Sequence, residues 1–170
     1  MKIEEIFATL KAHALEGLVF HDEMTRYYDF LSLEGYKKCH EHHYAEESKA
    51  YRKLCSFYMD HFNRFIPTNP MNRPNVIPES WYNYSRQDVD AGTKASGVKA
   101  GIIKWVEWET ETKNLYEDMC GELLNIGEIA AADFIMCYIK DVSEELKYAQ
   151  TKHLALESAG YDMKFILDEQ

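Results

Sequence analysis

Glutamates recur among apolar side chains in each of four long stretches with helical periodicity. The candidates are Glu16 or Glu23 in the first stretch, Glu47 in the second, Glu109 in the third and Glu145 in the fourth. A buried carboxylate is costly unless a cation or hydrogen-bond donor compensates its charge. Hard or borderline cations such as iron accept carboxylates from several helices, with an occasional histidine. The pattern predicts a metal centre inside a bundle, although single glutamates beside aromatic residues are also typical of a bundle's rim.

Long helices must position these acids. Apolar residues recur at helical spacing through most of the chain, while all four prolines lie between Pro67 and Pro78. Ser85 is placed as an N-cap and Gly160 as a helix stop. The predicted helices extend to Pro67 with a break near residues 33–35, from about 86 to 123, and from about 130 to 159.

The lengths of the connections indicate the topology. They are short, long and short, and a connection of about 20 residues can cross the length of a bundle. We therefore predict an all-α, ferritin-like four-helix bundle with one long crossover between helices two and three, and an apolar C-terminal tail or short helix. An up-down-up-down bundle with a decorative loop is the alternative. Gly92, Gly97 and Gly101 weaken the first half of the third helix, which we expect to be frayed or bent.

Composition limits the partners. The chain has 170 residues, which suits a single domain over 1–170. A net charge of −10 argues against nucleic acid and suits cations, although acidity also simply favours solubility. No apolar run is long enough for a membrane span, the four cysteines form no CxxC pair, and the first residues do not resemble a signal peptide. These features predict a reduced, cytoplasmic protein without a membrane partner.

Several segments resemble the bacterial non-haem ferritins. Residues 33–47, LEGYKKCHEHHYAEE, are similar to the loop and Glu-Glu pair that open the second helix of that family. Residues 133–145, DFIMCYIKDVSEE, resemble its fourth-helix signature, and Trp108-Glu109 is similar to the His-Glu of its third helix. Residues 160–166, GYDMKFI, resemble its tail. The resemblance covers nearly the whole chain except residues 66–100, which are longer than usual.

The resemblance implies an iron-storage protein with a ferroxidase centre in each bundle. The metal ligands it implies are Glu16 (with Glu23 as the rival), Glu47, Glu109 and Glu145, and those of an accessory iron position are Glu46, Asp141 and Glu144. It also implies Fe(II) and dioxygen or peroxide as partners, and a homo-oligomer that forms a shell. Zinc or manganese in place of iron, or no metal, are the alternatives.

Several positions depart from the family. Ala50 replaces the histidine that ligates the first iron, Val142 replaces a glutamine, and Glu23 stands where a tyrosine is expected. The site could instead have shifted along the bundle to His40, His43, Glu23 and Glu47. We adopt the plainer interpretation, that His40, His42 and His43 form a polar helix start.

Three functions follow from this comparison. The retained glutamates favour iron(II) oxidation and storage, which would make the chain a ferroxidase. The missing histidine and glutamine favour a degenerate bundle with weak or no metal binding and a structural or assembly role. Another di-metal oxidase is the third alternative, although such proteins usually keep Glu-x-x-His on two helices and this chain keeps neither.

Overall fold

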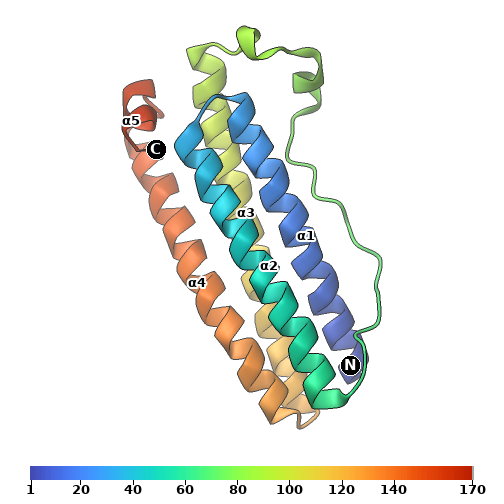
Figure 1. The fold of residues 1–170 in the computed structure, drawn as a ribbon. Helices are drawn as coiled ribbons and strands as arrows, with labels where there is room; N and C mark the ends of the chain where they lie inside the picture. The colour runs from blue at the N-terminus through green and yellow to red at the C-terminus, as the bar shows by residue number, and fades with distance from the viewer. Residues whose placement is uncertain (170) are drawn as a thin grey trace.

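The computed structural model describes residues 1–169, which form four long helices, joined by two short turns and one long connection, and a short helix after a further turn (Figure 1). The long helices are α1 (Ile3–Phe30), α2 (Glu34–Phe62), α3 (Ala91–Asn125) and α4 (Ile129–Ser158). The shorter elements are α5 (Met163–Asp168) and the 3-10 turns η1 (Glu79–Asn83) and η2 (Arg86–Asp88). The predicted all-α four-helix bundle with a short C-terminal helix is confirmed.

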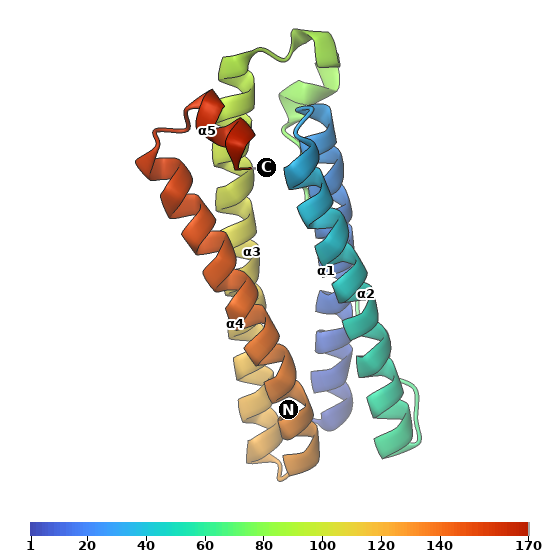
Figure 2. The ribbon, with the colours of Figure 1, turned by 60° about the vertical axis from the view of Figure 1, so that its left-hand side comes forward.

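The helices pack as two pairs. α1 packs against α2 and α3 against α4, and α1 also contacts α3 (Figure 2). The turn after α3 contains Gly127, whose φ of 81° lies in the left-handed region, and Glu128 N–H donates to the Leu123 carbonyl at 2.9 Å. This is the usual way in which a glycine ends a helix. None of the helices in residues 1–169 combines the length and apolar character that a membrane span requires.

The long connection follows α1. The Lys11 ammonium donates to the Ile66 carbonyl at 3.4 Å, Asn72 N–H donates to Glu16 Oε1 at 2.6 Å, and Arg86 pairs with Asp29. The connection therefore climbs from the first half of α1 to its end, as Figure 1 shows. It carries the chain from the end of α2 back to the start of α3, so these two helices run in the same direction. The predicted crossover is confirmed.

The start of α3 differs from the prediction. The helix begins at Ala91 rather than near residue 86, because Ser85 N–H and hydroxyl bind Asp88 at 2.7 and 2.8 Å and close a separate turn. Asp90 then caps α3 by accepting from Thr93 N–H at 2.7 Å.

The glycines in the first half of α3 do not fray it. Gly97 and Gly101 are buried where α3 meets α1, and the Tyr27 hydroxyl donates to the Gly97 carbonyl at 2.6 Å. A Cβ added to Gly101 would lie 2.5 Å from the Tyr28 hydroxyl oxygen. These glycines permit a close helix–helix contact, which offsets their low helix propensity.

The core contains two apolar clusters. One contains apolar residues from the second half of α1, the start of α2, the first half of α3 and the end of α4. The other contains residues from the start of α1, the second half of α2, the end of α3 and the first half of α4. The buried polar residues are His21, His40, His43, Glu109 and Thr112. His43 and Glu109 lie between the two clusters along their own helices, so the core is interrupted by polar groups near the middle of the bundle.

Substitution of Gly101 tests the close contact between α1 and α3. We expect Gly101→Ala to lower the free energy of unfolding by about 1–3 kcal/mol, because the added methyl group meets the buried Tyr28. The control is Gly121→Ala in the same helix, where a Cβ meets nothing within 4 Å. It should leave stability unchanged or raise it by up to about 1 kcal/mol. Urea unfolding measures both, and equal effects would contradict the contact.

Candidate metal centre

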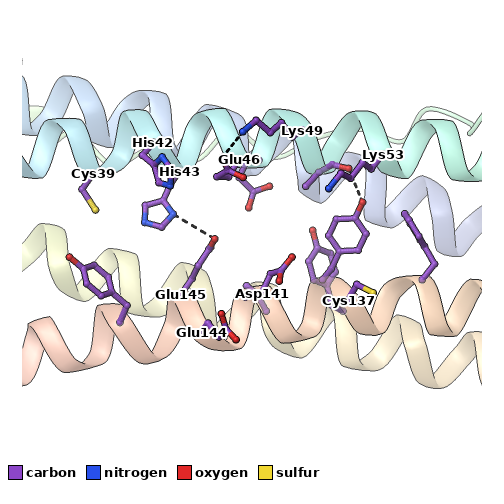
Figure 3. A pocket seen from close by; sticks show the side chains of 17 residues that line it. Cys39, His42, His43, Glu46, Lys49, Lys53, Cys137, Asp141, Glu144 and Glu145 are labelled. Atoms are coloured by element: carbon purple, nitrogen blue, oxygen red, sulfur yellow. Dashed lines mark hydrogen bonds and ion pairs between the residues drawn. The ribbon is translucent and has the colours of Figure 1, made fainter.

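A cleft of about 800 Å³ lies between α2 and α4, with Tyr116 of α3 also in its wall. Its lining is rich in charged side chains, and Figure 3 shows Glu145 and His43 facing each other across it. The carboxylates that line it are Glu46, Glu47, Asp141, Glu144 and Glu145. The cleft therefore gives solvent a route to the polar middle of the bundle.

Three of the predicted ligands act on one another at this cleft: Glu47 and Glu145 line it, and Glu109 lies deeper in the bundle. Glu109 on α3 is fully buried, and its Oε1 accepts from Trp105 Nε1–H at 2.9 Å, while its Oε2 has no hydrogen-bond partner. Burial, reinforced by the charges of Glu145 and Glu47, raises the pKa of Glu109 to about 8. Burial and the charge of Glu145 raise the pKa of Glu47 to about 7. Glu47, Glu109 and Glu145 thus form one electrostatically coupled group, which we call the carboxylate cluster.

Histidines from α1 and α2 border this cluster. His21 Nδ1 lies 3.0 Å from His40 Nδ1, and the rings of His21 and His43 stack with centroids 5.2 Å apart. His21 Nε2 lies 3.8 Å from Glu109 Oε1, and His43 Nδ1 lies 3.7 Å from Glu145 Oε1. The structure therefore joins His21, His40 and His43 to the carboxylates.

Their surroundings give the histidines different charges. Burial lowers the pKa of His40 to about 3 and holds that of His21 well below its usual range. Burial also lowers the pKa of His43, but the neighbouring Cys39 and Glu145 outweigh this effect and raise it to about 10. Burial thus disfavours a positive charge on His21 and His40, whereas Glu145 favours one on His43.

The polar helix start expected for the histidines is correct only for His42. That side chain is exposed, whereas 1% of His40 and 9% of His43 is exposed. The expectation failed because Trp105 of α3 and His21 of α1 cover one face of this helical turn. His21 was not predicted. Its only signal was its spacing on one helical face with Gly17, Met24 and Tyr28, all of which are buried.

The structure does not bring Glu16 or its rival Glu23 to the carboxylate cluster. Glu16 accepts from the backbone of Asn72, and Glu23 pairs with Arg73 at 3.3 Å, so both face the crossover. The position on α1 that faces Glu47 is occupied by Gly17, where a Cβ would lie 3.4 Å from Glu47 Oε2. In this region α1 offers the cluster an imidazole, from His21, in place of a carboxylate.

The accessory acids lie on the cleft but outside the buried cluster. Glu46 pairs with Lys49 at 2.7 Å, and Asp141 and Glu144 are exposed. The two positions where the resemblance implies a histidine and a glutamine carry apolar side chains that line the cleft. Val142 is 4% exposed, and the Tyr138 hydroxyl donates to the Ala50 carbonyl at 2.9 Å.

The donor set suits a divalent cation, although the side chains are not drawn together around one. Within residues 1–169, no group of three or more His, Cys, Asp or Glu side chains forms a ready-made ligand shell. The buried Glu109 Oε2 nevertheless lacks a partner, and no Lys or Arg in this part of the chain makes an ion pair with the carboxylate cluster. A cation would supply the missing partner and offset the repulsion.

Comparison with solved structures identifies the fold. The chain superposes on a protein described as a humanized archaeal ferritin with a TM-score of 0.80, over 98% of this chain and 92% of that one, at 16% sequence identity. The ferritin-like bundle predicted from the sequence is thereby confirmed. No protein-family model and no curated protein sequence matches the chain.

The raised pKa of Glu109 predicts a pH-dependent penalty in the metal-free protein. The Glu109 carboxyl group keeps its proton up to a pH of about 8 in the folded protein, but loses it above pH 4.5 in the unfolded chain. The free energy of unfolding therefore falls as pH rises from 4.5 to about 8. Glu109→Gln removes this penalty. In EDTA, we expect it to raise the free energy of unfolding by about 1–4 kcal/mol at pH 8.5 and to have little effect at pH 4.5.

The control is Glu111→Gln, an exposed residue two positions along the same helix. It should change stability by less than about 0.5 kcal/mol at either pH. Destabilisation by Glu109→Gln at pH 8.5, or an equal effect at both pH values, would contradict the buried, proton-holding carboxyl group.

Proposed function

We propose that this chain is a ferritin-like protein that binds Fe(II) at the carboxylate cluster and oxidises it with dioxygen or peroxide for storage. The observation that supports this most strongly is the approach of Glu47, Glu109 and Glu145 inside the bundle, where burial and mutual repulsion raise the pKa of Glu47 and Glu109. Such an arrangement is unfavourable in an empty site and favourable around a cation.

The cleft supports delivery of the metal. Glu46, Asp141 and Glu144 line it outside the cluster and add negative charge at its mouth. A cleft lined by one sign of charge raises the local concentration of counter-ions, which here are cations. Lys49 and Lys53 also line it, so the attraction comes from the excess of acids rather than from acids alone.

The cluster also suits oxidation of the bound iron. Each Fe(II) loses one electron to dioxygen or peroxide and becomes Fe(III). The added positive charge strengthens its attraction to the carboxylates, and hard oxygen ligands favour the harder ion. The three glutamates therefore stabilise the product more than the substrate, which is the direction that oxidation requires.

A bundle without metal chemistry is the second candidate. Three residues that have no side-chain ligand atom favour it. Gly17 lies against Glu47, and Ala50 and Val142 stand where the resemblance implies metal ligands. Under this alternative Glu109 keeps its proton around neutral pH while Glu47 is partly protonated, and the chain contributes only its packing surfaces.

Iron oxidation distinguishes the two candidates. After anaerobic addition of Fe(II), admission of air should produce ferric absorbance faster than in buffer. The double substitution Glu47→Gln, Glu109→Gln should slow this rate roughly 10-fold or more, because it removes two of the three charged ligands. Glu111→Gln is the matched control and should oxidise iron like the unaltered protein.

A rate no faster than buffer, with no effect of the double substitution, would contradict the proposed oxidation and favour the second candidate. Storage requires in addition a closed homo-oligomer. Size-exclusion chromatography should show an assembly far larger than a dimer, and a monomer or dimer would exclude storage.

A further inference from the structure

We infer that His21 and His43 provide nitrogen ligands to the bound metal, which then lies between them, Glu109 and Glu145. Each of the four long helices supplies one of these residues. The inference rests on the metal binding proposed above and specifies its ligands. The nitrogen ligands would come from His21 and His43, because Ala50 and Val142 stand where the resemblance implies a histidine and a glutamine.

The distances between nitrogen and oxygen atoms carry the argument. His21 Nε2 lies 3.8 Å from Glu109 Oε1, and His43 Nδ1 lies 3.7 Å from Glu145 Oε1. Both are too long for hydrogen bonds. Two ligand atoms on one Zn²⁺-sized ion lie about 3.4 Å apart in a tetrahedral site and about 4.2 Å apart at most. Both pairs therefore have the separation of ligands that share an ion.

Three of the atoms involved lack any other partner. His21 Nε2, His43 Nδ1 and Glu109 Oε2 are buried, and none has a hydrogen-bond partner. His21 and Glu109 are both fully buried, with 0% of each residue exposed. An ordinary buried polar network would close these bonds, since an unsatisfied buried group is costly. Their shared lack of partners in one place points to a group that binds them all.

Neighbouring side chains hold these ligands in position. His21 Nδ1 lies 3.0 Å from His40 Nδ1, and when His21 is the donor its Nε2 keeps the lone pair that a metal needs. Trp105 Nε1–H fixes Glu109 at 2.9 Å. His40 and Trp105 are thus positioning residues, like the hydrogen-bonding partners that orient metal ligands in other sites.

The proposed ligands differ in their access to solvent. The side chain of Glu145 is 27% exposed at the cleft, while those of His21 and Glu109 are 0% and 1% exposed. The half of the site formed by His21 and Glu109 is therefore in place without an ion, and Glu145 would have to move toward an ion to complete it. Two imidazoles favour borderline ions such as Fe(II), Co(II) and Zn(II) over Mg²⁺ or Ca²⁺.

Cobalt(II) alone serves as the probe, because its visible absorption reports coordination without any turnover. The metal-free full chain is titrated anaerobically with Co(II), and the loaded protein is measured by X-ray absorption. The unaltered protein should show back-scattering from two imidazole rings. His21→Gln and His43→Gln should each weaken Co(II) binding roughly 10- to 100-fold and change the visible bands. The control, His61→Gln, removes an exposed histidine in the last turn of α2 and should change neither.

The outcomes separate the two proposals. One outcome would overturn the inference and leave the proposed function intact. In it, Co(II) binds tightly without imidazole back-scattering, and binding is unchanged in both histidine variants but lost in Glu109→Gln. Failure of the unaltered protein to bind Co(II) would overturn both. X-ray absorption of the unaltered protein decides the ligands even where a histidine variant does not fold.

Discussion

Three carboxylates that approach one another inside the bundle impose the strongest physical constraint on this protein. Glu47, Glu109 and Glu145 come from three helices, and burial together with their mutual repulsion raises the pKa of Glu47 and Glu109. No Lys or Arg among residues 1–169 makes an ion pair with them, and the cationic side chain that pairs with this group is His43, at Glu145. One imidazolium offsets only part of the repulsion among three carboxylates, and a bound cation, as proposed above, would offset the rest.

The rest of the fold holds this unfavourable group in place. Gly97 and Gly101 let α1 and α3 approach closely at one end, and aromatic side chains fill the core around them. Between α2 and α4 the packing opens into a cleft that leads to the carboxylates. His21 and Glu109 are fully buried between the helices, whereas the cleft leaves Glu145 partly exposed. The contact between α1 and α3 thus contributes to stability, and the cleft between α2 and α4 gives access to the carboxylates.

Helical periodicity was enough to predict the four helices and to place Glu47, Glu109 and Glu145 on their inner faces, and the length of the second connection was enough to predict the crossover. It was not enough for α1. Glu16 and Glu23 share a partly buried face, but the segment that covers it is the irregular crossover, which has no periodic signal. The same limit applies to His40 and His43, since a run of polar residues does not reveal that Trp105 and His21 cover one face of it. Periodicity shows that a face is covered, and only the tertiary structure shows by what.

The position of the metal tests this account most directly. A crystal soaked anaerobically in Fe(II) and measured at the iron absorption edge should give an anomalous peak within bonding distance of Glu109 and Glu145, on the side of His21 and His43. A peak confined to the mouth of the cleft, beside Glu46, Asp141 and Glu144, or no peak at all, would contradict a metal centre in the middle of the bundle.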